Sequence, residues 1–178
     1  PLGQKGRMEF FKVAEQARPI ADKSGSFFPR TPVAPVSVRL GVHGIGIFGQ
    51  VEHIYREKQG LIRCKAGFGR LSPQRLLKNW IIHLALNLAL AGGSGPDRAE
   101  TRLMGQDPKA RKPVVVCTMK SLGEDARPLL ETLVQLYLDG RNRVVPFFCN
   151  AGFSLVSFLA EKKYPSDKNS LVQALSRA

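Results

Sequence analysis

Residues 49–67 read GQVEHIYREKQGLIRCKAG, and this stretch decides how the centre of the chain folds. A segment with Val51, Ile54 and Tyr55 leads to a turn at Gly60, and the apolar run LIRCKAG follows, so the pattern predicts two adjacent strands. Glu52 falls on the first strand, and Arg63 and Lys65 fall on the second. A carboxylate beside a strand that ends in lysine is the outline of a metal-dependent nuclease site.

Metal-dependent cleavage of a phosphodiester needs a second carboxylate, expected two residues before the lysine, and that position is occupied by Arg63. A guanidinium stays protonated, repels Mg²⁺ and attracts phosphate oxygens. We therefore predict no catalytic residue: Glu52, Arg63 and Lys65 are degenerate nuclease positions that suit holding a nucleic-acid backbone better than cutting it. Glu52 is either a residual metal ligand or, more commonly, a surface carboxylate paired with a neighbouring base.

The charge of the whole chain favours a polyanionic partner. Lys and Arg number 27 against 14 Asp and Glu among 178 residues, which gives a net charge of +13. Nucleic acid is the commonest partner of such a surface. The alternative is a basic piece of a larger assembly whose acidic partners are missing. No phosphate loop, paired-cysteine metal motif or catalytic triad is visible, so we predict no cofactor and no metal.

The basic residues gather where acidic residues are absent, because no Asp or Glu lies between Glu57 and Asp97. Sequence-independent contact with DNA phosphates is the natural role of such residues, although basic residues on a helix are as often a solvated face. The predicted DNA-binding residues are Arg63, Lys65, Arg70, Arg75 and Lys78, with a second group on a hairpin tip, Lys109, Arg111 and Lys112.

The periodicity along the chain predicts one α/β domain, residues 1–178, with a mixed central sheet that helices cover on both faces. The predicted helices span residues 1–23, 73–91, 125–140 and 153–163. The predicted strands span residues 35–42, 45–55, 61–67, 101–106 and 113–119. The first three strands are expected to form an antiparallel meander, and Leu129, Leu133, Leu136 and Tyr137 to form the apolar stripe of the third helix.

The cysteines and the longest apolar run indicate the cellular setting. Cys64, Cys117 and Cys149 lie in apolar runs without paired spacing, which is typical of buried free thiols in a reducing cytoplasm. The apolar run at residues 80–91 is too short to span a membrane.

Several landmarks also resemble a known family. The passage at residues 49–67, then LLKNWIIHLAL, LLETLVQLYLDG and VVPFF, with the opening PLGQKGRMEFF, are similar in order and spacing to the C-terminal domain of RecC, the gamma subunit of exodeoxyribonuclease V. The resemblance covers roughly residues 1–160. It implies a PD-(D/E)XK nuclease-like (restriction-endonuclease-like) core without a working active site, and a chain that is a fragment of a larger subunit.

The resemblance further implies what the domain works with. In that family the subunit lies at the duplex fork and scaffolds RecB-like and RecD-like partners in DNA repair and recombination. By position, the metal-binding residues of the active RecB nuclease would fall on Glu52, Arg63 and Lys65, of which Lys65 alone is retained. Two alternatives stay open: an active Mg²⁺-dependent nuclease with a relocated acid such as Glu57, and a purely protein–protein interface domain.

Overall fold

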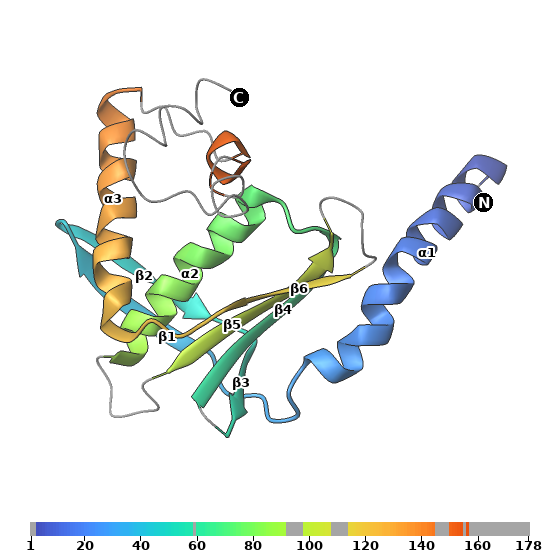
Figure 1. Cartoon of the computed structure of the whole chain (residues 1–178), viewed down its shortest axis with the longest axis horizontal. Coiled ribbons are helices and arrows are strands. Elements are labelled where there is room, and N and C mark those ends of the chain that lie inside the picture. Colours follow the sequence, from blue (N-terminus) through green and yellow to red (C-terminus); the bar gives the residue numbers. More distant parts are fainter. Residues whose placement is uncertain are drawn as a thin grey trace. The chain divides into compact units, whose positions relative to one another are not determined.

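The structure, a computed structural model, describes residues 3–58, 60–91, 98–107, 114–144, 150–154 and 156. The chain divides into two compact units, residues 1–138 and 139–178. The elements in chain order are α1 (Gln4–Phe27), β1 (Val36–Val42), β2 (Ile45–Val51), β3 (Ile54–Glu57), β4 (Gly60–Arg70), α2 (Pro73–Ala91), β5 (Ala99–Gln106), β6 (Val115–Met119), the 3₁₀ turn η1 (Gly123–Asp125) and α3 (Ala126–Asn142) (Figure 1).

The first unit is built on a mixed four-stranded sheet in the order β3-β4-β5-β6. Its two central strands, β4 and β5, are parallel, and the outer strands β3 and β6 each pair antiparallel to their neighbour. Strands β1 and β2 form a separate antiparallel hairpin. The mixed α/β architecture predicted from the sequence is therefore confirmed.

The predicted meander of the first three strands is wrong, because the chain changes sheets after Val51. The strand expected at residues 45–55 is two strands, β2 and β3, which belong to different sheets. The break falls at Glu52 and His53, and His53 has a φ of 61° in the left-handed region, which a continuous strand does not allow. The turn at Gly60 is where it was expected, with a φ of 146° that favours glycine.

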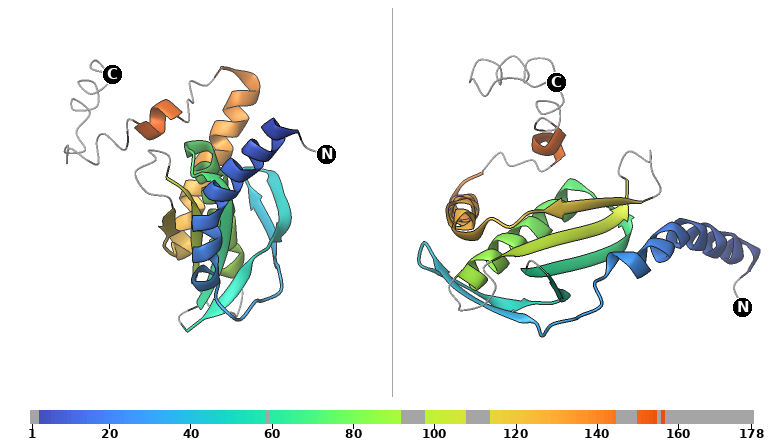
Figure 2. Two further views of the ribbon diagram at one scale, coloured as in Figure 1. Left: turned by 90° about the vertical axis from the view of Figure 1, so that its right-hand side faces the viewer. Right: turned by 60° about the horizontal axis from the view of Figure 1, so that its bottom comes forward.

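Helices α1 and α2 pack on opposite faces of the four-stranded sheet (Figure 2). Successive side chains of a strand point to opposite faces. On one face, Leu61 and Ala99 pack with Leu86 of α2 in a core that includes the β1–β2 hairpin. On the other, Met104 packs with Ile20 of α1. Because α1 buries only Ile20, most of its length before that residue is exposed.

The start of α2 follows the sequence prediction, whereas the buried face of α3 follows it only at Leu133, which is partly buried against the core. Ser72 precedes α2, and its Oγ accepts a hydrogen bond from the Arg75 backbone N at 3.4 Å, as expected of a helix cap. Within the first unit, α3 buries Ala126, Leu130 and Val134 against α2, while Leu129 is 42% exposed. The turn at residues 108–113 and most of the predicted helix at 153–163 lie outside the described residues.

The prediction of buried free thiols is confirmed for Cys64, whereas Cys117 is free but only partly buried. Cys64 and Cys117 are both free, and Cys64 is buried, whereas Cys149 lies outside the described residues. Burial raises the pKa of the Cys64 thiol to about 11, so this thiol is protonated and unreactive at neutral pH. Of the helices with described residues, none is both long and apolar enough to cross a membrane.

Candidate nucleic-acid interface

Four of the predicted DNA-binding residues lie on the second half of β4 and the first two turns of α2. We call Lys65, Arg70, Arg75 and Lys78 the β4–α2 basic face. Lys65, Arg70 and Lys78 are exposed, and Arg75 is half-buried. A two-residue link joins β4 to α2 and brings the start of the helix back to the end of the strand, where the Arg75 side chain contacts Gly67 and Gly69.

Two glycines of β4 position the Arg75 side chain. The guanidinium Nη1 donates a hydrogen bond to the Gly69 carbonyl oxygen at 3.1 Å. A Cβ added to Gly67 would lie 1.8 Å from Nη2 of Arg75, so only glycine leaves room for the guanidinium at this place. Arg75 is therefore held flat against the strand, with donors left over for a ligand, since a guanidinium carries five N–H groups.

The β4–α2 basic face is not neutralised by neighbouring acids. Across the described ranges, none of its four cations forms an ion pair; the ion pairs present involve Arg102, Arg127 and Arg143. The first turn of α2 also contains no acidic residue, so the positive end of the helix dipole adds to the field of the side chains. The arrangement suits a polyanion that approaches from the solvent.

Arg63 has a different environment from the other four predicted residues. Its side chain is 3% exposed and lies under α2, where Nη1 donates a hydrogen bond to Asn79 Oδ1 at 3.0 Å. Its Nε is buried and has no hydrogen-bond partner in the described part of the chain. Burial lowers the pKa of this guanidinium, although arginine remains charged at neutral pH. Arg63 thus places a positive charge inside the fold behind the basic face.

A buried polar row on α2 continues from Asn79 along the sheet; the sequence predicted a core or interface histidine at His83 but not the row. His83 and Asn87 follow at intervals of four residues, and they are 0% and 1% exposed. His83 Nδ1 lies 3.0 Å from Thr101 Oγ1, and His83 Nε2 lies 3.0 Å from the Lys120 carbonyl oxygen. The available signal was three polar residues at helical spacing within the apolar sequence NWIIHLALN.

Asn87 closes the row and holds the start of the next element. Its Oδ1 accepts hydrogen bonds from Ser121 Oγ at 3.1 Å and from the Leu122 backbone N at 3.0 Å. Its Nδ2 donates to the His83 carbonyl oxygen at 2.9 Å. The row therefore ties α2 to the sheet and to the segment before η1, which is a structural role.

The remaining predicted positions do not join the basic face. Glu52 is exposed and lies between β2 and β3, just outside the ladder in which Ile54 pairs with Arg63. Glu57 pairs with Gly60 at the far end of β4 and is held by Arg102, whose Nη1 lies 3.0 Å from Glu57 Oε1. The hairpin-tip residues lie outside the described residues: Lys109, Arg111 and Lys112. In the described ranges no three His, Cys, Asp or Glu side chains gather as metal ligands would.

The fold and the site define a mixed α/β domain with a carboxylate-poor basic face over a buried arginine. The sequence model of the family described as the RecC C-terminal domain matches residues 1–159. The chain therefore belongs to the RecC C-terminal domain family, as the resemblance indicated, and so represents part of a RecC subunit of exodeoxyribonuclease V. A search of curated proteins gave no significant match.

Proposed function

We propose that this chain is a non-catalytic DNA-binding and scaffolding domain of its RecC subunit, acting in double-strand break repair and recombination. Its core is a PD-(D/E)XK nuclease-like frame that retains the positive part of the site and has lost the metal-binding part. Unwinding and cutting belong to RecB-like and RecD-like partner subunits, and DNA is held through its phosphates without regard to sequence.

The observation that carries the proposal is the placement of Arg75. A guanidinium seated over Gly67 and bonded to the Gly69 carbonyl loses little side-chain entropy when it binds a phosphate oxygen. Lys65 on β4 and Lys78 on α2 add exposed point charges on the same two elements. Such contacts fix the position of a nucleic-acid backbone and do not read its bases.

The positions of Arg63 and Glu57 argue against Mg²⁺-dependent cleavage of DNA by this domain. Arg63 is a buried cation beneath the basic face, and a fixed positive charge there opposes Mg²⁺ binding. Glu57, the acid considered as a relocated ligand, is bonded to Arg102 and pairs with Gly60, five residues from Lys65 along β4. At a rise of about 3.3 Å per residue this is about 16 Å, too far for one metal site.

The scaffolding part of the proposal is supported by the exposed half of α1. Large apolar side chains lie on its surface: Met8 at 69%, Phe10 at 64%, Phe11 at 65% and Val13 at 64% exposure. Exposed apolar clusters of this kind mark protein–protein contacts. Figure 2 shows this part of α1 extending away from the strands, where a partner subunit would reach it.

The experiment is fluorescence anisotropy of a labelled 20-base-pair duplex and a forked duplex with two variants of equal charge. Lys65→Gln/Lys78→Gln removes two cations from the β4–α2 basic face, and Lys5→Gln/Lys12→Gln removes two exposed cations from α1. We expect the first variant to bind roughly tenfold more weakly, since each phosphate contact contributes on the order of 0.5–1 kcal/mol, and the second to bind nearly as wild type. Equal losses in both would mean that only net charge matters and would refute the site.

A further inference from the structure

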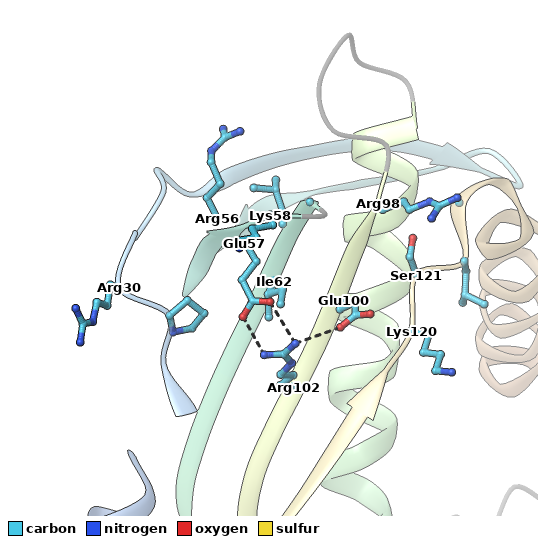
Figure 3. A pocket seen from close by; sticks show the side chains of 15 residues that line it. Arg30, Arg56, Glu57, Lys58, Ile62, Arg98, Glu100, Arg102, Lys120 and Ser121 are labelled. Atoms are coloured by element: carbon cyan, nitrogen blue, oxygen red, sulfur yellow. Dashed lines mark hydrogen bonds and ion pairs between the residues drawn. The ribbon is translucent and has the colours of Figure 1, made fainter. Parts of the chain in front are cut away.

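A second basic surface lies at the other end of β4 and is not used by the proposed DNA contact. An open groove of about 1250 Å³ is formed there by the loop after α1, the β3–β4 hairpin, the residue before β5 and the segment after β6 (Figure 3). It exists because α1 covers Met104 and ends at Phe27, which leaves Ile62 and Arg102 without a helix over them.

The rim of the groove carries unpaired cations on two sides. Arg30, Arg56 and Lys58 come from the β3 side, and Arg98 and Lys120 from the β5–β6 side (Figure 3). In the described parts of the chain none of these five side chains forms an ion pair, whereas Arg102 does. The lining holds six cationic and two anionic side chains, and so a net of four positive charges.

The walls of the groove are fixed before any ligand arrives. The Arg56 backbone N donates to the Thr31 carbonyl oxygen at 2.9 Å, which ties the loop carrying Arg30 to β3. On the opposite wall, the Arg98 carbonyl oxygen accepts a hydrogen bond from the Leu61 backbone N at 3.1 Å. A rim that is already ordered loses less entropy on binding.

The composition of the groove floor bears on whether the groove suits a nucleic acid or an acidic peptide. Arg102 crosses it between two carboxylates, with Nη1 3.0 Å from Glu57 Oε1 and Nη2 3.6 Å from Glu100 Oε2 (Figure 3). These carboxylates would repel any anionic group at the floor, phosphate or carboxylate, so the acidic groups of a ligand would bind at the cationic rim. The apolar residues of the floor and walls include Pro29, Ile62 and Leu122, and no aromatic side chain on which a base could stack is among the described lining.

We infer that this groove binds an acidic peptide segment of a partner protein, with Asp or Glu side chains on the cationic rim and apolar side chains on the floor. The chemistry that selects it is a rim of cations around a partly apolar, carboxylate-containing floor. The site is separate from the β4–α2 basic face, so its test does not depend on whether that face binds DNA.

The test uses the full chain, a fluorescent peptide of alternating Glu and Leu, and a single-stranded oligonucleotide of the same charge. The groove variants are Arg98→Gln/Lys120→Gln and Arg30→Gln/Arg56→Gln, one on each wall. All four residues are exposed, so the variants should fold, which circular dichroism checks. The matched control is Lys65→Gln/Lys78→Gln.

We expect both groove variants to bind the peptide roughly fivefold more weakly, since each loses two surface charge contacts, and the control to bind it as wild type. A wild-type chain that ignores the peptide would overturn the inference. Equal losses in the control would do so too, as would groove variants that lose the oligonucleotide and keep the peptide, which would assign the groove to nucleic acid.

Discussion

The Arg63 guanidinium lies inside the fold with Asn79 Oδ1 as its side-chain acceptor at 3.0 Å. A charge removed from water is tolerated only when it is hydrogen-bonded, so this one amide oxygen stabilises the arginine in its buried position. The pair joins β4 to α2 directly beneath the basic face. Its removal should therefore weaken the fold before it changes any surface.

We predict that Asn79→Ala lowers the free energy of unfolding by about 2–3 kcal/mol, because it leaves a buried charged donor without its partner. Urea unfolding measures this, and Lys78→Ala, the exposed neighbour on α2, is the control with little change. The double variant Arg63→Met/Asn79→Leu should recover most of the loss, since an apolar pair needs no hydrogen bond. If the double variant were no more stable than Asn79→Ala, the unpaired charge of Arg63 would not be the cause of the lost stability.

Gly67 gives a second prediction, which separates binding from stability. A Cβ at Gly67 would lie 1.8 Å from Arg75 Nη2, whereas a Cβ at Gly69 would lie at an ordinary 3.5 Å from Nη1. Gly67→Ala should displace the guanidinium and weaken DNA binding as much as Arg75→Ala does, with a small change in stability because a flexible side chain moves. Gly69→Ala should bind nearly as wild type; equal effects of the two alanines would contradict the assigned role of Arg75.

The sequence predicted which residue types occupy the site but not which of them are buried. The acid-free interval predicted Lys65, Arg70, Arg75 and Lys78 as DNA-binding residues, and the structure places them on β4 and α2. The sequence could not show that Arg63 is buried, because strand alternation gives two faces without saying which face, or which part of that face, a helix covers. Arg63 and Lys65 share a face, and α2 covers only the first of them.

Among the elements, α2 holds the fold together and carries its polar row inside. His83 is fully buried, and burial lowers its pKa from the ordinary value of 6.5, so the folded chain keeps it neutral. The unfolded chain takes up a proton near pH 6.5 while the folded chain does not. Stability is therefore complete above that pH and falls as the pH drops from about 6.5 towards the lower pKa of the folded state.

We predict a loss of at most about 1.4 kcal/mol per pH unit in that window, measured as the free energy of unfolding at pH 7.5, 6.5 and 5.5. His83→Gln should be less stable at pH 7.5 but should lose this part of the pH dependence. His53→Gln, an exposed histidine in the link between β2 and β3, should keep the wild-type profile. A His83→Gln profile parallel to wild type would rule out His83 as the titrating group.

The sequence did not predict the buried face of α3 well, because two apolar stripes on this helix fit the sequence equally well. The apolar residues of α3 occupy adjacent helical stripes, and the pattern chosen contained Leu129 and Tyr137, which are 42% and 62% exposed. The buried stripe is Ala126, Leu130 and Val134, which contact α2 and β1, and of the predicted residues Leu133 is partly buried beside it. The change of sheet at Glu52 and His53 did leave a signal that was overlooked, since the apolar positions change phase between Val51 and Ile54, which are three residues apart.

Helix α1 should tolerate polar substitution on its exposed half. Phe10→Ser/Phe11→Ser should change the free energy of unfolding by less than about 0.5 kcal/mol, since both rings are exposed. Co-purification with RecB-like and RecD-like subunits should fall, because the apolar contact surface is lost. Val116→Ser, an exposed position on β6, is the control that should keep assembly. Normal assembly by the α1 variant would remove α1 from the scaffold proposal.

For the whole molecule, the excess of positive charge is divided between surfaces with different surroundings. The net charge of +13 alone predicts attraction to any polyanion. The structure adds that the β4–α2 basic face is free of ion pairs within the described residues, while the groove at the other end of β4 contains carboxylates. We therefore expect DNA affinity to depend on a few placed cations and not on the total charge.

The most direct test is the salt dependence of duplex binding by the wild-type chain with Mg²⁺ present, followed by a gel of the same DNA. Four phosphate contacts predict that log K falls against log salt with a slope of about −3.6, because each neutralised phosphate contributes about −0.9. The account predicts this slope, a shallower one of about −1.8 for Lys65→Gln/Lys78→Gln, and intact DNA. Binding that ignores salt, or DNA cut by the wild-type chain, would contradict it.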